Sequence, residues 1–320
     1  MLKQVPKKVP KPPLISVVVP VAPGGSIKML TDSLKKANYP KDRIEVIVAE
    51  GKKPAYQRNL ASKKAKGDYI FFFDDDVAVE KNAIRELLKG FKSGAELVGG
   101  PNLTPSADSL IQKAHGRAMA SFFGAAKMKT RYVSEGDMRE AGETDLILCN
   151  LAVTKKAFLK EGGFKEDLYP NEENYLFNQM RAHGKKLIYN PRAVVYHSRR
   201  DSIGKMARQV FHYGGGRREQ TFMQPSSFSP MFLVPSAFFL YLVSLALYQP
   251  LWYFWPLRLY IIADLVFSLW NSRRDPMYFF ILPWMFPLIH ISYGAGFLFG
   301  WIFRRKGARS REVTIKKVRL

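Results

Sequence analysis

Short apolar runs alternate with helical spacing over the first two hundred residues. Runs 15–21, 43–50 and 68–73 are dominated by β-branched and aromatic residues, which predicts buried strands. After the first run, apolar residues such as Leu30 and Leu34 recur at the spacing of one helical face. Strand and helix therefore alternate, which is typical of an α/β domain.

Consecutive βα units favour a Rossmann-like, mixed and mostly parallel sheet flanked by helices. Ligands of such sheets bind beyond the carboxyl ends of the strands. Loop 22–26 carries a glycine pair, loop 50–53 a glutamate and two lysines, and loop 74–76 three consecutive aspartates. We expect these loops to converge on one crevice, where they suit a phosphate-bearing substrate and a metal ion.

The hydrophobic pattern changes near residue 225. The apolar tracts 230–248, 251–270 and 278–303 each approach or exceed the ~20 residues that span a bilayer. The alternative is that these tracts are buried helices of a soluble domain. Three such tracts in succession favour transmembrane segments over this alternative. The predicted organisation is a flexible basic N-terminus (1–14), an α/β domain (15–200), an amphipathic helix with a linker (201–229), a transmembrane region (230–303) and a basic tail (304–320).

The number of spans conflicts with the distribution of charge. Three spans would separate the α/β domain from the tail, yet both are basic, and the positive-inside rule favours both in the cytoplasm. One tract is then re-entrant or interfacial. Arg258 makes the second tract a candidate, and Pro283 with Pro287 makes the third one.

The segment that begins at Ile203 predicts a basic amphipathic helix. Such a helix lies in a membrane interface with its arginines on lipid headgroups, or packs on the core of its own domain. The apolar stripe consists of Ile203, Met206, Ala207, Val210 and Phe211, and the flanking basic residues are Lys205, Arg208, Arg217 and Arg218.

Composition narrows the partners and the compartment. The chain has 50 Lys and Arg against 27 Asp and Glu, a formal net charge of +23, so it favours an anionic partner such as lipid, nucleic acid or phosphorylated small molecules. The one cysteine, Cys149, forms no intramolecular disulfide, which agrees with a reducing compartment. We interpret its thiol as a packing group.

Three aspartates follow the apolar strand 68–73. Hard cations such as Mg²⁺ and Mn²⁺ bind carboxylate oxygen together with substrate phosphates, and an Asp-x-Asp at a strand end supplies it. The alternative is a solvated turn in which Asp74 or Asp76 caps the next helix. The chain has neither the Gly-x-x-x-x-Gly-Lys-Ser/Thr of phosphate-binding loops nor a Gly-x-Gly-x-x-Gly after a strand.

Several motifs together resemble a known family. They are "SVVVPV", "VIVAEG", "RNLASKKAKGDYIFFFDDD" and "CNLAVTKKAFLKEGGFKEDLYPNEENYLFNQMRAHGKKLIYNPRAVVYH", in this order. Over about residues 15–200 the chain resembles family 2 glycosyltransferases with a GT-A fold. The resemblance implies inverting transfer of a sugar from a nucleotide diphosphate sugar, assisted by Mg²⁺ or Mn²⁺.

The resemblance also implies roles for single residues. Asp76 falls on the more direct metal position of the Asp-x-Asp, and Cys149 precedes a family position on the acceptor side, Asn150. Two departures leave the donor base and sugar open: "APGG" follows the first strand, and few residues separate Glu50 from Arg58. The implied metal ligands are Asp74, Asp76 and His197, and the implied nucleotide-sugar residues are Pro20, Glu50, Lys52, Arg58, Asn59, Asp74 and Asp75.

The motif "NEENYLFNQMRAHG" supplies the implied catalytic base. Inversion by single displacement needs a group that takes the proton of the acceptor hydroxyl, and a partly dehydrated carboxylate can do so. Glu173 occupies the family's base position and Glu172 competes with it. The alternative is a pair of surface glutamates in the first turn of a helix. For His197 the alternative to metal binding is a structural role.

The expected function is that of a multi-pass membrane glycosyltransferase whose catalytic domain faces the cytoplasm. The apolar tracts favour contact with membrane lipids and a lipid-linked acceptor, first a polyprenyl diphosphate oligosaccharide and second a polyprenyl phosphate. The Gln-x-x-Arg-Trp of processive synthases is absent. The rival is a non-catalytic basic protein that binds lipid or nucleic acid by charge. Its binding would be opposed by the acidic clusters, so we expect no nucleic-acid partner.

Overall fold

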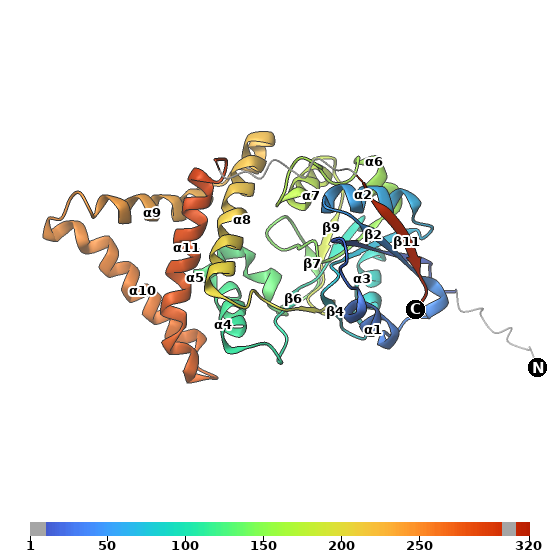
Figure 1. Ribbon diagram of the computed structural model, residues 1–320, viewed down its shortest axis with the longest axis horizontal. Coiled ribbons are helices and arrows are strands. Elements are labelled where there is room, and N and C mark those ends of the chain that lie inside the picture. Colours follow the sequence, from blue (N-terminus) through green and yellow to red (C-terminus); the bar gives the residue numbers. More distant parts are fainter. Residues whose placement is uncertain (1–10, 303–311) are drawn as a thin grey trace, which may run out of the picture.

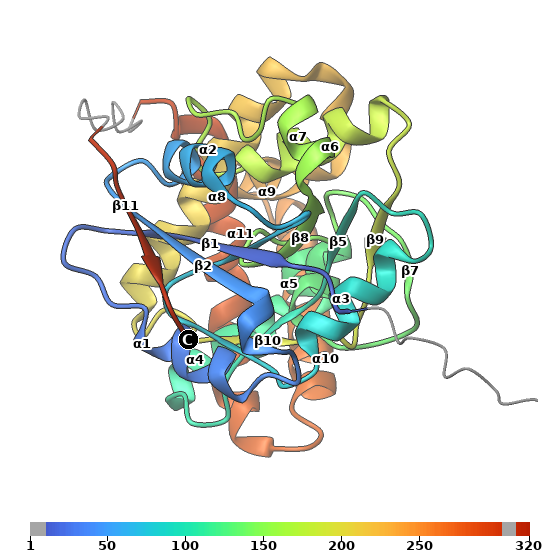
Figure 2. The ribbon, with the colours of Figure 1, turned by 90° about the vertical axis from the view of Figure 1, so that its right-hand side faces the viewer.

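An eight-stranded mixed sheet forms the centre of the first domain (Figures 1 and 2). The computed structural model describes residues 11–302 and 312–320. The strand order is β11-β2-β1-β3-β8-β5-β9-β7. The strands are β1 (Ile15–Val21), β2 (Ile44–Glu50), β3 (Tyr69–Phe73), β5 (Leu97–Gly99), β7 (Arg139–Glu140), β8 (Asn150–Thr154), β9 (Leu187–Tyr189) and β11 (Thr314–Val318).

Strands β2, β1, β3, β5 and β9 run in one direction, and β11, β8 and β7 run in the other. The sheet is therefore mixed and mostly parallel, as predicted. Val21 of β1 is in register with Glu50 of β2, so these two strands end level with each other. The loops that follow them begin at the same edge.

Helices cover both faces of the sheet. On one face α1 (Lys28–Lys36) and α3 (Ala83–Phe91) pack on β1 and β3, whereas α2 (Pro54–Lys64), α6 (Lys155–Lys160) and α7 (Glu172–Ala182) pack on the other. Successive side chains of a strand point to opposite faces, so a strand covered on both sides is apolar throughout. In β3, Phe71 and Phe73 accordingly lie in one core and Phe72 in the other.

A small second sheet lies beside the aspartates. It pairs β4 (Val77–Val79) with β10 (Val195–His197), and β10 with β6 (Asn102–Leu103). Asp74 to Asp76 thus occupy the turn from β3 into β4. His197 is in register with Val77, which brings the end of β10 next to that turn.

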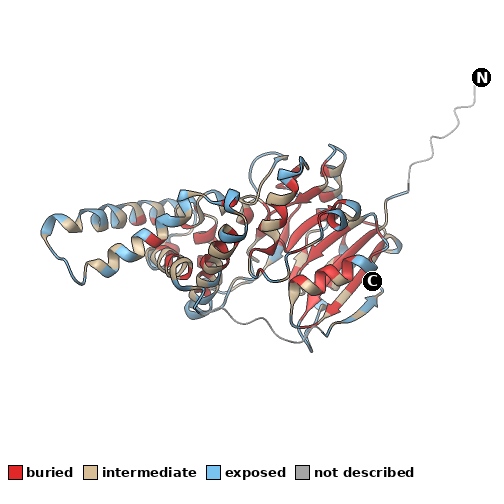
Figure 3. Ribbon diagram, turned by 90° about the horizontal axis from the view of Figure 1, so that it is seen from above, coloured by how far each residue is buried: buried red, intermediate tan, exposed pale blue. Residues whose placement is uncertain are grey.

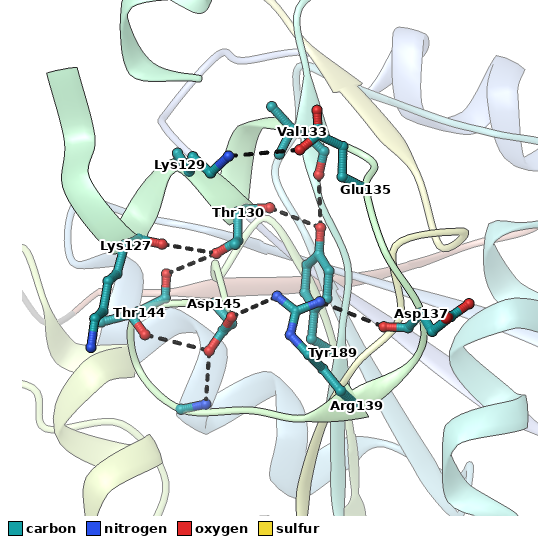
Figure 4. A network of polar contacts seen from close by, with 11 residues as sticks. Lys127, Lys129, Thr130, Val133, Glu135, Asp137, Arg139, Thr144, Asp145 and Tyr189 are labelled. Atoms are coloured by element: carbon teal, nitrogen blue, oxygen red, sulfur yellow. Dashed lines mark hydrogen bonds and ion pairs between the residues drawn. The ribbon is translucent and has the colours of Figure 1, made fainter. Parts of the chain in front are cut away.

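A long connection between β6 and β8 crosses the far edge of the sheet. It contains α4 (Leu110–Met119), α5 (Phe122–Ala125), a 3-10 helix (Ala126–Tyr132) and β7. Figure 4 shows how its last part is attached. The hydroxyl of Tyr189 lies 2.8 Å from the carbonyl oxygens of both Thr130 and Val133, and the Arg139 guanidinium lies 4.5 Å from the Tyr189 ring centroid. Arg139 Nη2 also lies 2.9 Å from Asp145 Oδ1.

Among the described residues, four α-helices follow the α/β domain: α8 (Ile203–Met223), α9 (Val234–Ser244), α10 (Trp255–Asn271) and α11 (Leu282–Phe299). Helices α8 and α11 lie side by side, and α9 with α10 form a hairpin that extends away from the rest of the molecule (Figure 1). Further 3-10 helices are Lys41–Arg43, Pro225–Ser227, Pro230–Leu233, Leu251–Phe254 and Pro276–Phe280.

Glycines let α8 approach α11 closely. A Cβ on Gly214 would lie 2.2 Å from the Tyr293 carbonyl oxygen, and one on Gly296 would lie 2.0 Å from that of Phe211. Two residues of the stripe of α8, Met206 and Val210, are buried with residues of α4 and α11, whereas Ile203 at its start is 52% exposed. The buried part of the stripe fits the packing alternative.

One helix in the described part of the chain, α11, is long and apolar enough to cross a membrane. A single such helix is weak evidence for a membrane span, because a buried core helix of a soluble protein can have the same length and apolar composition. The predicted multi-pass arrangement is therefore not supported. Helix α9 has 11 residues and α10 has 17, and the hairpin they form is largely exposed or half-buried (Figure 3).

The predicted basic tail contains a strand. Its residues 304–311 lie outside the described residues, but β11 pairs antiparallel with β2 at the edge of the main sheet (Figure 2). Val313 and Ile315 pack against one core, and Val318 and Leu320 against the other. The C-terminus therefore belongs to the α/β domain.

Candidate active site

The loops after β1, β2 and β3 meet as predicted. The backbone N–H of Gly24 donates to Glu50 Oε1 at 3.2 Å, which joins the first loop to the second. A Cβ on Gly25 would lie 3.4 Å from Asp75 Oδ2, so the first loop also lies against the aspartates. The Gly24 hydrogen bond and, after it, Lys316 lower the pKa of Glu50. Glu50 is therefore a carboxylate held in place where these loops meet.

Arg58 connects the two acidic motifs. It lies on α2, with only 6% of its side chain exposed. Its Nη2 is 2.7 Å from Asp74 Oδ1, and its Nη1 is 3.4 Å from Glu172 Oε1. A buried cation between two carboxylates offsets part of their repulsion. The Asp-x-Asp turn and the start of α7 are thereby fixed relative to each other.

His197 faces the last aspartate of the turn. Its Nε2 lies 3.1 Å from Asp76 Oδ1. Burial acts to lower the pKa of His197, but hydrogen bonds to Asp76 and Cys149 outweigh it and raise this pKa to about 10. Burial acts to raise the pKa of Asp76. The hydrogen bond from His197 and the charge of His197 outweigh burial, so the pKa of Asp76 lies below its usual value. The two groups form an ion pair.

Asp75, in the middle of the turn, differs from its neighbours. Partial burial, followed by the charges of Asp76 and Asp74, raises the pKa of Asp75. Three adjacent carboxylates with few cations repel one another, and a bound cation would relieve that repulsion.

The donor groups at this turn fit a divalent cation. Asp74, Cys149 and His197 each present a ligand atom, and these atoms lie within 4.8 Å of one another. Carboxylate oxygen and imidazole nitrogen suit Mn²⁺, whereas thiolate suits softer metals. Cys149 also accepts a hydrogen bond from Asn102 Nδ2 at 3.1 Å. Its place beside His197, with which it shares a hydrogen bond, was not predicted, since the two residues are distant in the sequence.

Glu172 and Glu173 begin α7 and face different surroundings. Glu172 is buried beside Arg58, and burial, followed by the charge of Glu173, raises the pKa of Glu172 to about 8. Glu173 is half-buried and makes no hydrogen bond or ion pair within the described residues. The side chains of Tyr132 and Tyr213 lie close enough for its charge to contribute to their raised pKa values, after burial.

The other predicted site residues have less direct positions. Lys52 is exposed in the turn before α2, and Pro20 is buried near the end of β1. Asn59 binds the loop before α7: its amide exchanges two hydrogen bonds with the backbone of Phe164, each 2.8 Å long. Asn150 is buried and donates to the carbonyl oxygens of Pro101 and Ala193. Its role toward an acceptor stays a prediction.

A buried polar cluster behind α7 was also not predicted. Glu143 accepts from Arg217 at 2.9 Å, from Gln220 at 2.8 Å and from Asn178 at 3.0 Å. The cluster joins the long connection to α7 and α8. Arg217 was expected to flank an apolar stripe that either lies in a membrane interface or packs on the core. Its side chain is only 2% exposed and pairs with Glu143 inside the protein.

The sequence profile described as glycosyltransferase like family 2 matches residues 8–215. Among solved structures, the chain resembles mannosyltransferase PcManGT from Pyrobaculum calidifontis in complex with GDP-Man and Mn²⁺, at 14% identity and a TM-score of 0.58, covering 95% of this chain and 92% of that chain. It also matches TarS 1-349 of S. aureus in complex with UDP-GlcNAc, at 14% identity and a TM-score of 0.44, covering 92% and 93%. No curated protein sequence matches the chain.

The profile covers more than half of the chain, so the protein belongs to the glycosyltransferase-like family 2. Its fold is the α/β GT-A fold, shared with the mannosyltransferase structure. The protein is therefore a glycosyltransferase, and the rival interpretation as a non-catalytic basic binder is set aside.

Proposed function

We propose that this protein transfers a sugar, with inversion, from a nucleotide diphosphate sugar to a lipid-linked acceptor at the cytoplasmic face of a membrane. The observation that carries the proposal is the arrangement at the end of β3. There the Asp74–Arg58–Glu172 bridge joins the two acidic motifs, and the Asp76–His197 pair lies beside it. A solvated turn would need no buried arginine behind it.

The donor would bind across the loops after β1, β2 and β3. Asp74, Asp76 and His197 would hold Mg²⁺ or Mn²⁺, because carboxylate oxygen and neutral imidazole nitrogen suit these cations. A bound cation would replace the proton that His197 now shares with Asp76. A bound cation would neutralise charge on the departing diphosphate. Arg58 holds Asp74 in place, and the Gly24 N–H holds Glu50, the residue proposed to read the nucleotide base.

Glu173 is the proposed base. Its carboxylate takes the proton of the acceptor hydroxyl while the hydroxyl oxygen bonds to the anomeric carbon and the bond from that carbon to the diphosphate oxygen breaks. Its half-buried position and lack of a described ion-pair partner leave it available for this proton. Glu172 is buried against Arg58 and acts as a positioning residue.

The α9–α10 hairpin is the proposed membrane contact. At its far end Leu247 is 88% exposed and Leu251 80%, and Trp252 and Trp255 beside them are also exposed. An exposed apolar surface of this kind marks a membrane or protein contact, and tryptophan favours the bilayer interface. The net charge of +23 favours an anionic membrane. A lipid-linked acceptor, first a polyprenyl diphosphate oligosaccharide, would reach the crevice from this surface.

Calorimetric titration of the detergent-purified protein with UDP, GDP, ADP and CDP, with Mn²⁺ or with chelator, tests the donor site. We expect manganese-dependent binding of one of them. Product formation with a short-chain polyprenyl diphosphate saccharide, but not with polyprenyl phosphate, would support the first acceptor, and the reverse would favour the second. If no nucleotide binds to the folded protein, the catalytic assignment is withdrawn.

Two variants near the same turn separate metal binding from packing. His197→Ala should weaken manganese-dependent nucleotide binding by about tenfold or more, as expected when a ligand of the metal is lost. Cys149→Ser should keep that binding within about threefold, because Mn²⁺ does not need a thiolate. Equal losses in both variants would contradict the ligand set.

A further inference from the structure

The C-terminal strand reaches the loop after β2, which belongs to the proposed donor site. Thr314 of β11 is in register with Glu50, and Val318 with Val46, so β11 runs along β2 from Val46 to its carboxyl end at Glu50. A Cβ on Gly51 would lie 3.1 Å from both the Glu312 carbonyl oxygen and Val313 Cγ2. The turn that follows Glu50 is therefore packed directly against the chain that leads into β11.

Glu50 is held from two sides. One carboxylate oxygen accepts the Gly24 N–H at 3.2 Å, and Lys316 Nζ of β11 lies 3.3 Å from the other. The next residue, Lys317, pairs instead with Glu45 near the opposite end of β2. Two adjacent lysines of one strand thus hold two different glutamates, and only one of these lies at the crevice.

We propose that β11 forms a wall of the donor site and that Lys316 is a positioning residue that orients Glu50 toward the nucleotide base. The inference rests on the proposed function. Bases differ in where they present N–H donors beside carbonyl acceptors, so a carboxylate selects among them only when its orientation is fixed. Gly24 alone fixes one oxygen, and Lys316 fixes the second. Base preference is therefore set partly by the last residues of the chain.

The alternative is that β11 only covers a sheet edge, which protects the edge from pairing with another chain. In that role β11 would stabilise the fold, and its loss would weaken the binding of all nucleotides alike. In that case Lys316 and Lys317 would be equivalent, since each makes one exposed ion pair with a glutamate of β2.

The test compares Lys316→Ala with its matched control Lys317→Ala in the full-length protein. Calorimetry with Mn²⁺ and UDP, GDP, ADP or CDP gives the preference of each variant for the favoured base. Lys316→Ala should weaken binding of the favoured nucleoside diphosphate by up to about fivefold, the value of one exposed ion pair, and should narrow the preference by a similar factor. Lys317→Ala should leave the preference unchanged, and Lys316→Arg should retain it.

The outcomes distinguish the inference from the proposed function. Equal behaviour of the two alanine variants, or equal weakening of all nucleotides by Lys316→Ala, would overturn the inference and leave the donor site in place. Thermal unfolding of both alanine variants shows whether a loss of nucleotide binding comes from a less stable fold. If the wild-type protein binds no nucleotide, the proposed function fails and the inference fails with it.

Discussion

Arg58 has one role that no other described residue shares: its guanidinium contacts both Asp74, in the turn after β3, and Glu172, at the start of α7. Removing one partner of a buried polar contact is costly, because the desolvation of the group that remains is no longer offset. Asp74 keeps 30% of its side chain exposed, but Glu172 is almost fully buried. Glu172 therefore depends on Arg58 more than Asp74 does.

The two glutamates should separate in a kinetic experiment. Glu173→Gln should lower kcat by about 10²–10⁴-fold, the usual contribution of a general base, with nucleotide affinity nearly unchanged. Glu172→Gln should lower kcat less, because the amide still occupies the position beside Arg58. Steady-state kinetics together with nucleotide calorimetry checks both variants. A larger loss for Glu172→Gln would move the catalytic role to that residue.

The raised pKa of Glu172 predicts how stability depends on pH. Its pKa is about 8 in the fold against 4.5 for the free group, so the folded state holds a proton that the unfolded state releases. Stability then falls as pH rises from about 4.5 to about 8. Glu172→Gln removes this loss, so its melting temperature should rise relative to wild type between pH 5 and pH 8.

Thermal unfolding of wild type and Glu172→Gln at pH 5 and at pH 8, with the detergent and salt held constant, measures this difference in melting temperature. Glu173→Gln serves as a graded control, since it removes the second cause of the shift and should give a smaller change in the same direction. A pH-independent difference between Glu172→Gln and wild type would show that Glu172 is ionised in the fold.

At the scale of elements, the crossing of α8 and α11 depends on glycine. Gly214→Ala would place a methyl group 2.2 Å from the Tyr293 carbonyl oxygen, and a shift of backbone is needed to accept it. We expect a loss of about 1–3 kcal/mol in stability, as for other overpacked interiors. Gly204→Ala, on the same helix, meets no atom within 4 Å and should be neutral or stabilising by up to about 1 kcal/mol. Thermal unfolding of the two variants measures the contrast.

The success of sequence-based prediction also differs from element to element. Strands β1, β2 and β3 were predicted closely, because a strand buried on both faces needs a continuous apolar run. Strand β11 was missed: its half-polar run pairs with a strand some 266 residues earlier, the separation of Lys316 and Glu50, and no local pattern reports such a partner. The β-branched residues of "VTIKKV" were the available signal.

In the candidate site, too, contacts between residues distant in the sequence could not be predicted. The acidic residues were predicted because their chemistry occurs in consecutive positions, at 74–76 and 172–173. The contact of Cys149 with His197 and the Glu143–Arg217 pair were not, because each joins distant segments. A buried arginine and an arginine at a lipid surface have the same local sequence, and only the tertiary partner distinguishes them.

At the scale of the whole molecule, the pairing of β11 with β2 resolves the conflict between the number of spans and the charge of the two ends. Both belong to one sheet, so the α/β domain and the C-terminus lie on the same face of any membrane. At 1.5 Å per residue, α9 is about 16 Å long and α10 about 25 Å, both short of the ~30 Å hydrocarbon core. The hairpin would enter the bilayer and return to the same face.

This arrangement predicts the accessibility of the two ends. Tags at the N-terminus and the C-terminus should be equally digested, or equally protected, when sealed vesicles that carry the protein are treated with protease. Digestion of one tag with protection of the other would require an odd number of crossings and would contradict the pairing of β11 with the catalytic sheet.

The same arrangement predicts which surface holds the membrane. Leu251→Asp places a charge at the tip of the hairpin, where burial in hydrocarbon costs about 2.5–3.5 kcal/mol, so flotation with anionic vesicles should fall sharply. Leu159→Asp is the matched control, because Leu159 is an exposed leucine of α6 in the catalytic domain. Nucleotide binding in detergent should survive both changes, since neither residue lies at the crevice. Equal flotation of the two variants would place the membrane contact elsewhere, with α11 as the next surface to test.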